Sequence, residues 1–219
     1  MSLAYLAVVP DKEYSDATIT ALEKSRAVFS LPVIYICPPD CFVPAYFNYK
    51  IIRVNIDYKN YSEWMIKELY KYIDTDHVIT IQYDSCIINA GFWSDEFLQY
   101  DYIGAPWPNN WTNRVGNGGF SLRSFKFTRQ NSLLNYIKTG HKILDGEDYF
   151  SCVTNHVLLC NQGVKFAPVD LARKFCVEHP IPEKWHDYND LSTYDSFAFH
   201  SIYNKAGMKF IGGEVSLSK

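Results

Sequence analysis

Residues 76–84 read DHVITIQYD, and this stretch decides how the rest of the chain is interpreted. It is an apolar, β-branched run of the kind that forms a buried strand, and an acid, Asp84, follows it directly. In open α/β sheets, ligands gather beyond the carboxyl ends of the strands, where a carboxylate can hold a hard cation against a diphosphate. Asp also begins many ordinary turns, so Asp84 alone does not define a site.

The residues before this stretch alternate between strand and helix patterns. The second helix, which follows Asn60, carries an apolar stripe that recurs every four residues from Tyr61 to Ile73. This order predicts a doubly wound α/β layer. We expect strands over 3–9, 33–37 and 51–54 and helices over 15–29 and from 61 onward.

The residues after Asp84 differ in character. Residues 84–125 are rich in Gly, Asn, Trp and Pro and show little periodicity, which indicates an irregular, functional half. Further on, we expect helices over about 125–138 and 147–161, a strand over 164–169 and a loop over 185–199.

Composition excludes some classes of protein. The net charge is −3 and no basic block occurs, which argues against a nucleic-acid partner. The six cysteines form no CxxC pair and most stand in apolar runs, which favours free thiols in a reducing, cytoplasmic compartment. The N-terminal apolar run is too short for a signal peptide or membrane anchor, so we expect no transmembrane segment.

Two neighbouring segments, DYIGAPW at 101–107 and RVGNGGFSLRS at 114–124, contain a glycine-rich turn. Gly116, Gly118 and Gly119 let the backbone approach a ligand closely, and Asn117 stands among them. A tight hairpin would use the same residues. The spacing matches neither a P-loop nor a dinucleotide fingerprint.

Two further segments carry ionisable side chains. LDGEDYF, at 144–150, places Glu147 and Asp148 at a helix start, which suits either a capping cluster or a general base. We expect the helix dipole to keep the pKa of Asp148 low. In SFAFHSIYN, at 196–204, His200 follows aromatic residues; a lone His is more often structural, but with an acid it can complete a cation site.

In this order, QYD, DYIGAPW, GNGGFSLRS, GED and the late His200 resemble an uncharacterised group of GT-A-like proteins. That group is labelled a domain of unknown function and is often found near polysaccharide genes. The order is more distantly similar to that of the inverting galactosyltransferases. The resemblance runs from about Val78 to His200, and the part before Val78 shares only its β-α-β pattern.

The resemblance implies a role for each matching residue. Asp84 would be the last acid of a degenerate DxD motif and would bind metal together with His200, while Gln82 replaces the first acid of the motif. Asp148 would be the catalytic base, and the neighbouring catalytic residue Glu147 would hold a hydroxyl group of the acceptor. The remaining donor- or acceptor-binding positions would be Trp107, Asn117, Gly118, Gly119 and Arg123. Trp107 would either stack on a sugar or anchor a packed loop, and either Arg123 or Lys174 would supply further positive charge to the phosphates.

The implied fold is α/β of the GT-A (nucleotide-diphospho-sugar transferase) type, a single domain over 1–219 with a central mostly parallel mixed sheet flanked by helices. Residues 1–83 would form the nucleotide-binding half and 84–219 the acceptor or catalytic half. The implied activity is an inverting, Mn²⁺- or Mg²⁺-dependent transfer from a UDP- or GDP-sugar to a glycan or glycoprotein hydroxyl. A non-catalytic carbohydrate- or nucleotide-binding module and a nucleotide-sugar hydrolase are the alternatives.

Overall fold

The computed structural model describes residues 1–109 and 111–212, and its centre is a six-stranded mixed sheet of order β3-β2-β1-β4-β7-β6. The first four strands in this order are parallel, and β7 is antiparallel to both of its neighbours. A three-stranded sheet of order β5-β9-β8 contacts the large sheet through β9 and β7. The predicted α/β class with a mostly parallel central sheet is confirmed.

The elements have the following bounds. The strands are Leu3–Val8 (β1), Val33–Cys37 (β2), Lys50–Arg53 (β3), His77–Ile81 (β4), Ser85–Ile87 (β5), Tyr102–Gly104 (β6), Phe120–Ser124 (β7), Cys176–Val177 (β8) and Ala198–His200 (β9). The helices are Ser15–Val28 (α1), Tyr61–Lys67 (α2), Phe125–Leu133 (α3), Glu147–Tyr149 (α4), His156–Asn161 (α5), Val169–Phe175 (α6) and Lys205–Ile211 (α7). A π-helical turn, Phe150–Thr154, separates α4 from α5, and 3-10 turns cover Lys12–Tyr14, Ala45–Phe47, Leu69–Lys71, Ala90–Phe92, Asp95–Gln99 and Leu191–Thr193.

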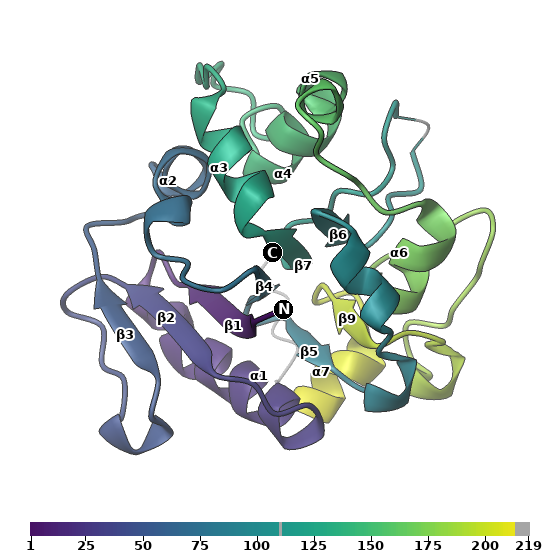
Figure 1. Cartoon of the computed structure of the whole chain (residues 1–219). Helices are drawn as coiled ribbons and strands as arrows, with labels where there is room; N and C mark the ends of the chain where they lie inside the picture. Colours follow the sequence, from purple (N-terminus) through teal and green to yellow (C-terminus); the bar gives the residue numbers. More distant parts are fainter. Residues whose placement is uncertain (110, 213–219) are drawn as a thin grey trace.

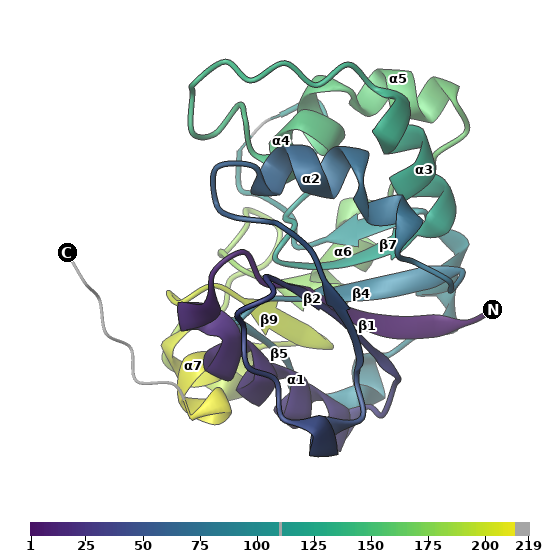
Figure 2. The ribbon, with the colours of Figure 1, turned by 90° about the vertical axis from the view of Figure 1, so that its left-hand side faces the viewer.

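Helices cover both faces of the large sheet. In the two views of the ribbon, α2 and α3 lie on one face, and α1 and α7 lie on the other (Figures 1 and 2). The alternation of side chains along β1 explains this arrangement: Tyr5 and Ala7 join the core on the α1 side, whereas Leu6 and Val8 pack with Met65 of α2. A third buried cluster, with Phe127 of α3 at its centre, joins α3 to α5.

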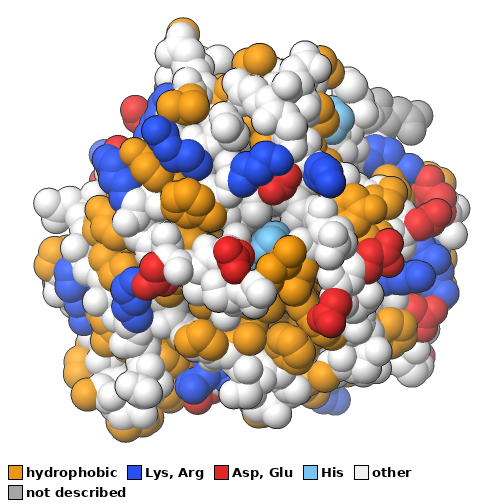
Figure 3. All heavy atoms as spheres, in the orientation of Figure 1, with side chains coloured by type: hydrophobic (Ala, Val, Ile, Leu, Met, Phe, Trp, Pro, Cys, Tyr) orange, Lys and Arg blue, Asp and Glu red, His pale blue; other side chains and the backbone are white. Residues whose placement is uncertain are grey.

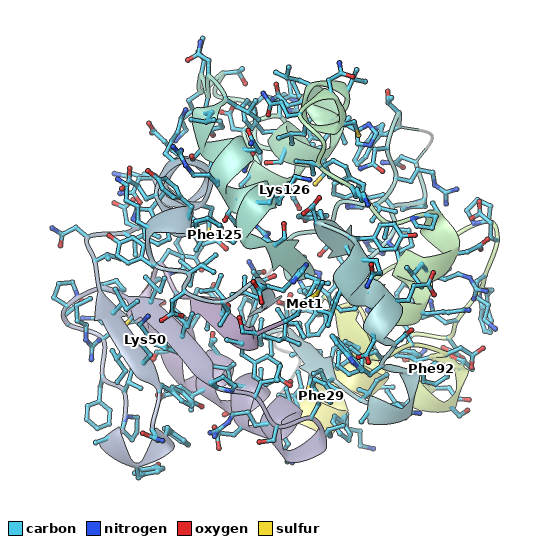
Figure 4. All side chains as sticks on the ribbon, in the orientation of Figure 1. Met1, Phe29, Lys50, Phe92, Phe125 and Lys126 are labelled. Carbon is cyan, nitrogen blue, oxygen red and sulfur yellow. The ribbon has the colours of Figure 1, made fainter. Side chains whose placement is uncertain are left out.

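The parallel strands fix the two edges of the sheet. The carboxyl ends of β1, β2 and β4 meet at the left-hand edge in Figure 2, and the N-terminus lies at the opposite edge. Met1 and Lys126 are labelled in Figure 4, which looks onto this amino edge. Lys126 lies in the first turn of α3 there, and its Nζ donates to Oδ2 of Asp101, 3.2 Å away. Asp84 follows β4 at the carboxyl edge, where ligands of open α/β sheets bind.

Several expected elements are shorter or absent. The 164–169 strand is wrong: only a single bridge pairs Phe166 with Tyr102, because Pro168 already begins the cap of α6. The helix expected over 147–161 is broken by the π-helical turn, and the one over 125–138 ends at Leu133. The loop expected over 185–199 ends in β9, which carries His200.

The six cysteines are free, and five of them are buried, as expected from their apolar surroundings. None of the helices in residues 1–109 and 111–212 has the length and apolar composition that a membrane span requires.

Candidate active site

Strand pairing brings Asp84 and His200 together. Asp84 lies in the turn between β4 and β5, and β5 is antiparallel to β9, with Ser85 opposite His200. Oδ1 of Asp84 is 3.4 Å from Nε2 of His200. Residues that are more than a hundred positions apart are thereby adjacent, as the resemblance implied.

A third ionisable side chain, Glu178, lies on the other side of the imidazole. It follows β8, which runs parallel to β9, and its Oε1 is 3.4 Å from Nδ1 of His200. Burial opposes a charged imidazole, but Asp84 and Glu178 outweigh it and raise the pKa of His200 to about 10. His200 in turn lowers the pKa of both carboxyl groups, against the effect of their burial.

Three buried atoms of this cluster lack a hydrogen-bond partner of good geometry. They are Oδ1 of Asp84 and the two ring nitrogens of His200. A buried polar atom without a partner costs free energy unless something else satisfies it. Among the described residues, no group of three or more His, Cys, Asp or Glu side chains is arranged as a complete metal site.

The glycine-rich turn lies directly against these groups. A Cβ atom on Gly119 would stand 2.0 Å from Nε2 of His200, and one on Gly118 would stand 2.3 Å from Oε1 of Glu147. Both distances are far below van der Waals contact, so this turn needs glycine for close approach to the ionisable side chains.

Asn117 connects the turn to Glu178. Its Nδ2 donates to Oε2 of Glu178 over 2.7 Å, and its Oδ1 accepts from the backbone N–H of Gly119 over 3.0 Å. Asn117 is buried, so both contacts are sheltered from water.

Glu147 and Asp148 differ in surroundings although they are adjacent. Glu147 is buried and receives two hydrogen bonds from the Arg123 guanidinium, of 2.7 and 3.1 Å. Asp148 is partly exposed, and its Oδ2 accepts from the backbone N–H of Gly118 over 3.1 Å. Burial, and then the charge of Glu147, raise the pKa of Asp148 to about 6.

The low pKa expected for Asp148 is therefore wrong. The expectation rested on a helix dipole, but α4 is only three residues long and its backbone dipoles sum to little. Loss of hydration and a neighbouring carboxylate decide the pKa instead.

A pocket of about 370 Å³ opens at the carboxyl ends of β1 and β4. Four tyrosines contribute to its walls, which carry no ionised group. The walls are formed by Val8, Val9, Pro10, Tyr14, Thr18, Tyr58, Tyr61, Gln82 and Tyr83. The rings of Tyr14 and Tyr83 contact each other with centroids 4.7 Å apart, and Nε2 of Gln82 donates to the hydroxyl of Tyr61 over 3.3 Å. Gln82 is thus part of the wall of this pocket.

The remaining candidates lie in other surroundings. Trp107 packs on Gly116 and meets the ring of Trp111 edge to face, and Trp111 meets Tyr149 in the same way. These three rings form an aromatic row that ends next to Asp148. Arg123 is 1% exposed and bound to Glu147, and Lys174 is exposed on α6.

Sequence reasoning missed Glu178 and the tyrosines of the pocket. Glu178 follows the apolar run Phe175–Val177, the same strand-end position that singled out Asp84. The run was too short to be recognised as a strand. The tyrosines come from three separate segments, around positions 14, 58–61 and 83, and only the folded chain brings them together.

Comparisons with known proteins agree with this architecture. The chain belongs to the family described as "Protein of unknown function (DUF5672)", whose profile matches residues 47–200. No curated protein matches it. It is similar to the galactosyltransferase LgtC, solved in complex with donor and acceptor sugar analogs, with a TM-score of 0.54 and 11% identity over 100% of this chain and 97% of that one.

A second solved structure is that of the glycosyltransferase GlyE of Streptococcus pneumoniae TIGR4, in its apo form. Its TM-score is 0.54 and its identity 9%, over 99% of this chain and 62% of that one. At such identities the likeness establishes the fold alone. The fold is the GT-A fold of the glycosyltransferases, as expected.

Proposed function

We propose that this protein is a metal-dependent glycosyltransferase that moves a sugar from a UDP- or GDP-sugar to a hydroxyl group of a glycan or glycoprotein. One observation carries the proposal: Asp84, His200, the glycine turn and Asp148 converge at the carboxyl edge of the sheet, which also bears the aromatic pocket. Ligands of open α/β sheets bind at this edge. The shared fold with LgtC, solved with donor and acceptor sugar analogs, supports the proposal.

The Asp84 and His200 pair fits a hard divalent cation. Oδ1 of Asp84 and Nε2 of His200 are buried, lie near each other and lack hydrogen-bond partners of good geometry, so a cation between them would satisfy both by displacing the proton that the two carboxylates favour on the imidazole. Mg²⁺ in nucleotide enzymes takes one or two protein ligands and completes its shell with phosphate oxygens and water. Bound Mn²⁺ or Mg²⁺ would supply neutralisation of charge on the leaving diphosphate.

Glu178 would position His200 for this task. A carboxylate that faces the second nitrogen of a metal-binding imidazole fixes its orientation and increases its basicity. Through Asn117, the same carboxylate also holds the backbone of Gly119 in place. Glu178 therefore keeps the imidazole and the glycine turn in a fixed relation.

The aromatic pocket suits the nucleoside of the donor. The faces of Tyr14, Tyr58, Tyr61 and Tyr83 provide surfaces on which a base and a ribose can pack. Gln82, between the pocket and Asp84, would hydrogen-bond the ribose in place of the missing first acid of the motif. The phosphates would then extend toward Asp84.

Asp148 would act as the general base. A carboxylate with a pKa of about 6 is ionised at neutral pH and still basic enough to accept a proton from an acceptor hydroxyl. Attack by that hydroxyl in a single displacement inverts the anomeric centre. The row of Trp107, Trp111 and Tyr149 would hold the acceptor sugar beside it.

Glu147 and Arg123 would act by positioning. Their buried ion pair faces the backbone of Gly118, to whose carbonyl Nη2 of Arg123 donates over 3.2 Å. Through this hydrogen bond the pair holds the glycine turn in place. The charge of Glu147 also contributes to the raised pKa of Asp148.

The test is a panel of UDP- and GDP-hexoses, each incubated with the protein and Mn²⁺ with and without mixed glycan acceptors. Proton NMR follows the anomeric signals of donor and product. Acceptor-dependent glycoside formation with inverted configuration is expected. Release of free sugar at an equal rate without acceptor would identify a nucleotide-sugar hydrolase, and tight binding without turnover would identify a binding module.

A further inference from the structure

The exposed aliphatic side chains are concentrated in one short part of the described chain. Among all the described residues, seven Ile, Leu and Val side chains are exposed, and six of the seven fall between positions 133 and 158. These six are Leu133, Ile137, Ile143, Leu144, Val157 and Leu158, with exposures from 42% to 68%. Single exposed apolar residues are normal, but such a concentration marks an interaction surface. We call these six residues, together with Lys138, His141 and Lys142, the apical surface.

The ionisable side chains within the segment that carries most of these residues are basic. No Asp or Glu occurs between positions 102 and 144, although the whole chain is acidic. Lys138, His141 and Lys142 are exposed, whereas Asp145 and Glu147 are buried. On the neighbouring helix α2, Glu63 is exposed, and Glu68, which follows α2, is paired with Lys71. The nine residues of the apical surface are themselves apolar or basic, and the acids of α2 lie beside them.

The apical surface lies at one end of the molecule, and its loop lies on the side of the candidate active site. Figure 2 shows the 134–146 segment as an outermost loop at the top, beside α5 and above the carboxyl edge of the sheet. In Figure 3, hydrophobic side chains reach this same end, and Lys and Arg side chains gather below it over α2 and α3. Arg129 is one of the exposed cations of α3.

The loop is also held in a fixed conformation. The buried carboxylate of Asp145 accepts hydrogen bonds of 2.7 Å from the backbone N–H groups of Thr139 and Gly140. Tyr136 donates to the carbonyl of Asp145 over 2.8 Å, which closes the base of the loop. Because the loop is already ordered, it would lose little conformational entropy when its exposed apolar side chains bind a partner.

We propose that the apical surface binds the protein to a membrane that contains anionic phospholipids. Aliphatic tips that project between lysines suit a lipid interface, where apolar groups enter the acyl region and cations meet the head groups. A protein-binding surface would instead be enriched in aromatic residues and poor in lysine. Leu144 of this surface is only four residues from Asp148 of α4, so under the proposed function the acceptor hydroxyl would be presented at the membrane surface.

The test is flotation of the full chain with vesicles of phosphatidylcholine alone or mixed with phosphatidylglycerol. The wild type is expected to bind the mixed vesicles at low salt and to leave phosphatidylcholine unbound. Lys138→Gln with Lys142→Gln should weaken binding roughly 25-fold, since each cation near an anionic surface is worth ~1 kcal/mol. Ile143→Ser with Leu144→Ser should weaken it about tenfold.

The matched control is Phe42→Ser with Tyr46→Ser, two side chains that are 76% and 80% exposed away from this surface. These changes should leave vesicle binding unaltered. The proposal is overturned if mixed vesicles bind no protein, or if the control weakens binding as much as the apical variants do. It is also overturned if sedimentation shows a dimer that the Ile143 and Leu144 changes dissociate. Nucleotide binding in solution should be equal in all variants, so a failure of this proposal is distinct from a failure of the transferase proposal.

Discussion

The side-chain amide of Asn117 donates a 2.7 Å hydrogen bond to Oε2 of Glu178, while Oε1 of the same carboxylate lies 3.4 Å from Nδ1 of His200. One carboxylate therefore contacts both the glycine turn and the imidazole. A displacement of Glu178 would disturb both, because it contacts Nδ1 of the imidazole and the Asn117 amide, whereas Asp84 contacts Nε2. This relation makes Glu178 a sensitive point for testing the site.

Glu178→Gln is expected to weaken metal binding by ~10–100-fold, the usual effect of removing a carboxylate behind a metal-binding imidazole. Its amide retains volume and can still pair with Asn117, so folding should be preserved. Calorimetry of UDP or GDP binding with titrated Mn²⁺ measures the effect. Glu183→Gln, at an exposed position paired with Arg114, is the control. Equal Mn²⁺ dependence in both variants would exclude Glu178 from the site.

Removal of the metal should abolish most donor binding. The pocket walls carry no cation for the phosphates, and Arg123 is engaged by Glu147. Affinity for UDP or GDP should therefore fall strongly in EDTA and return with Mn²⁺, and Asp84→Asn should show the EDTA level in either condition. Asp170→Asn, exposed on α6, serves as the control. Unchanged affinity in EDTA would remove the cation from the proposed function.

Gly119→Ala tests the close contact with His200. The added methyl would stand 2.0 Å from Nε2, so either the imidazole or the turn must move. We expect a loss of ~1–3 kcal/mol in the free energy of unfolding, as for other overpacked sites, together with loss of Mn²⁺-dependent nucleotide binding. Gly91→Ala, whose methyl would be 3.1 Å from a side-chain oxygen of Asn89, should affect neither. A fully active Gly119→Ala protein would show that the turn is more open than described.

The strands of the parallel layer could be predicted from sequence because each is a short apolar run bounded by Pro, Asp or Asn. The 164–169 segment has the same local pattern but makes a single bridge, since its place in the sheet depends on tertiary contacts. His200 and Asp84 were found as separate candidates, and their adjacency follows from the register of β5 and β9.

The chemistry of the acids could not be predicted in the same way. Glu147 and Asp148 are neighbours in sequence, yet one is locked to Arg123 and the other faces the glycine turn. Which of the two is paired depends on the position of Arg123 on β7, a strand more than twenty residues away. The pKa of Asp148 follows from that pairing and from burial, and neither is visible in the sequence.

The activity should depend on pH through Asp148. The base must be ionised, so at saturating Mn²⁺ the rate should rise as the pH increases through about 6 and then level. Asp148→Asn should remove this limb and lower kcat by ~10²–10⁴-fold while donor affinity is retained. Glu147→Gln removes a neighbouring negative charge, so in this variant the rise of the rate with pH should occur at a lower pH than in the wild type. A limb that persists in Asp148→Asn would place the base elsewhere.

The free energy of unfolding should also depend on pH through Asp148. The pKa of Asp148 is about 6 in the folded chain against an ordinary value of 3.8, so the folded state binds this proton more tightly. Its contribution to stability is complete below the unfolded pKa and is lost as the pH rises through about 6. Asp148→Asn cannot ionise and escapes that loss. Its free energy of unfolding relative to wild type should therefore improve by about 1–3 kcal/mol between about pH 4 and pH 8, a range reduced for the partial exposure of the side chain.

Comparing two pH values separates this effect from the constant cost of the substitution. The two oxygens of Asp148 accept separately from the backbone N–H groups of Gly118 and Tyr149, and a side-chain amide offers only one oxygen, so Asp148→Asn loses one of these hydrogen bonds at every pH. Denaturant unfolding of both proteins at the two pH values gives the difference directly. If the difference stays constant, the carboxyl group titrates normally in the folded chain and Asp148 is not held as a base near neutral pH. If it grows as expected, the folded chain gives up stability to keep this carboxylate ionised beside Glu147, a cost that fits a group retained for catalysis.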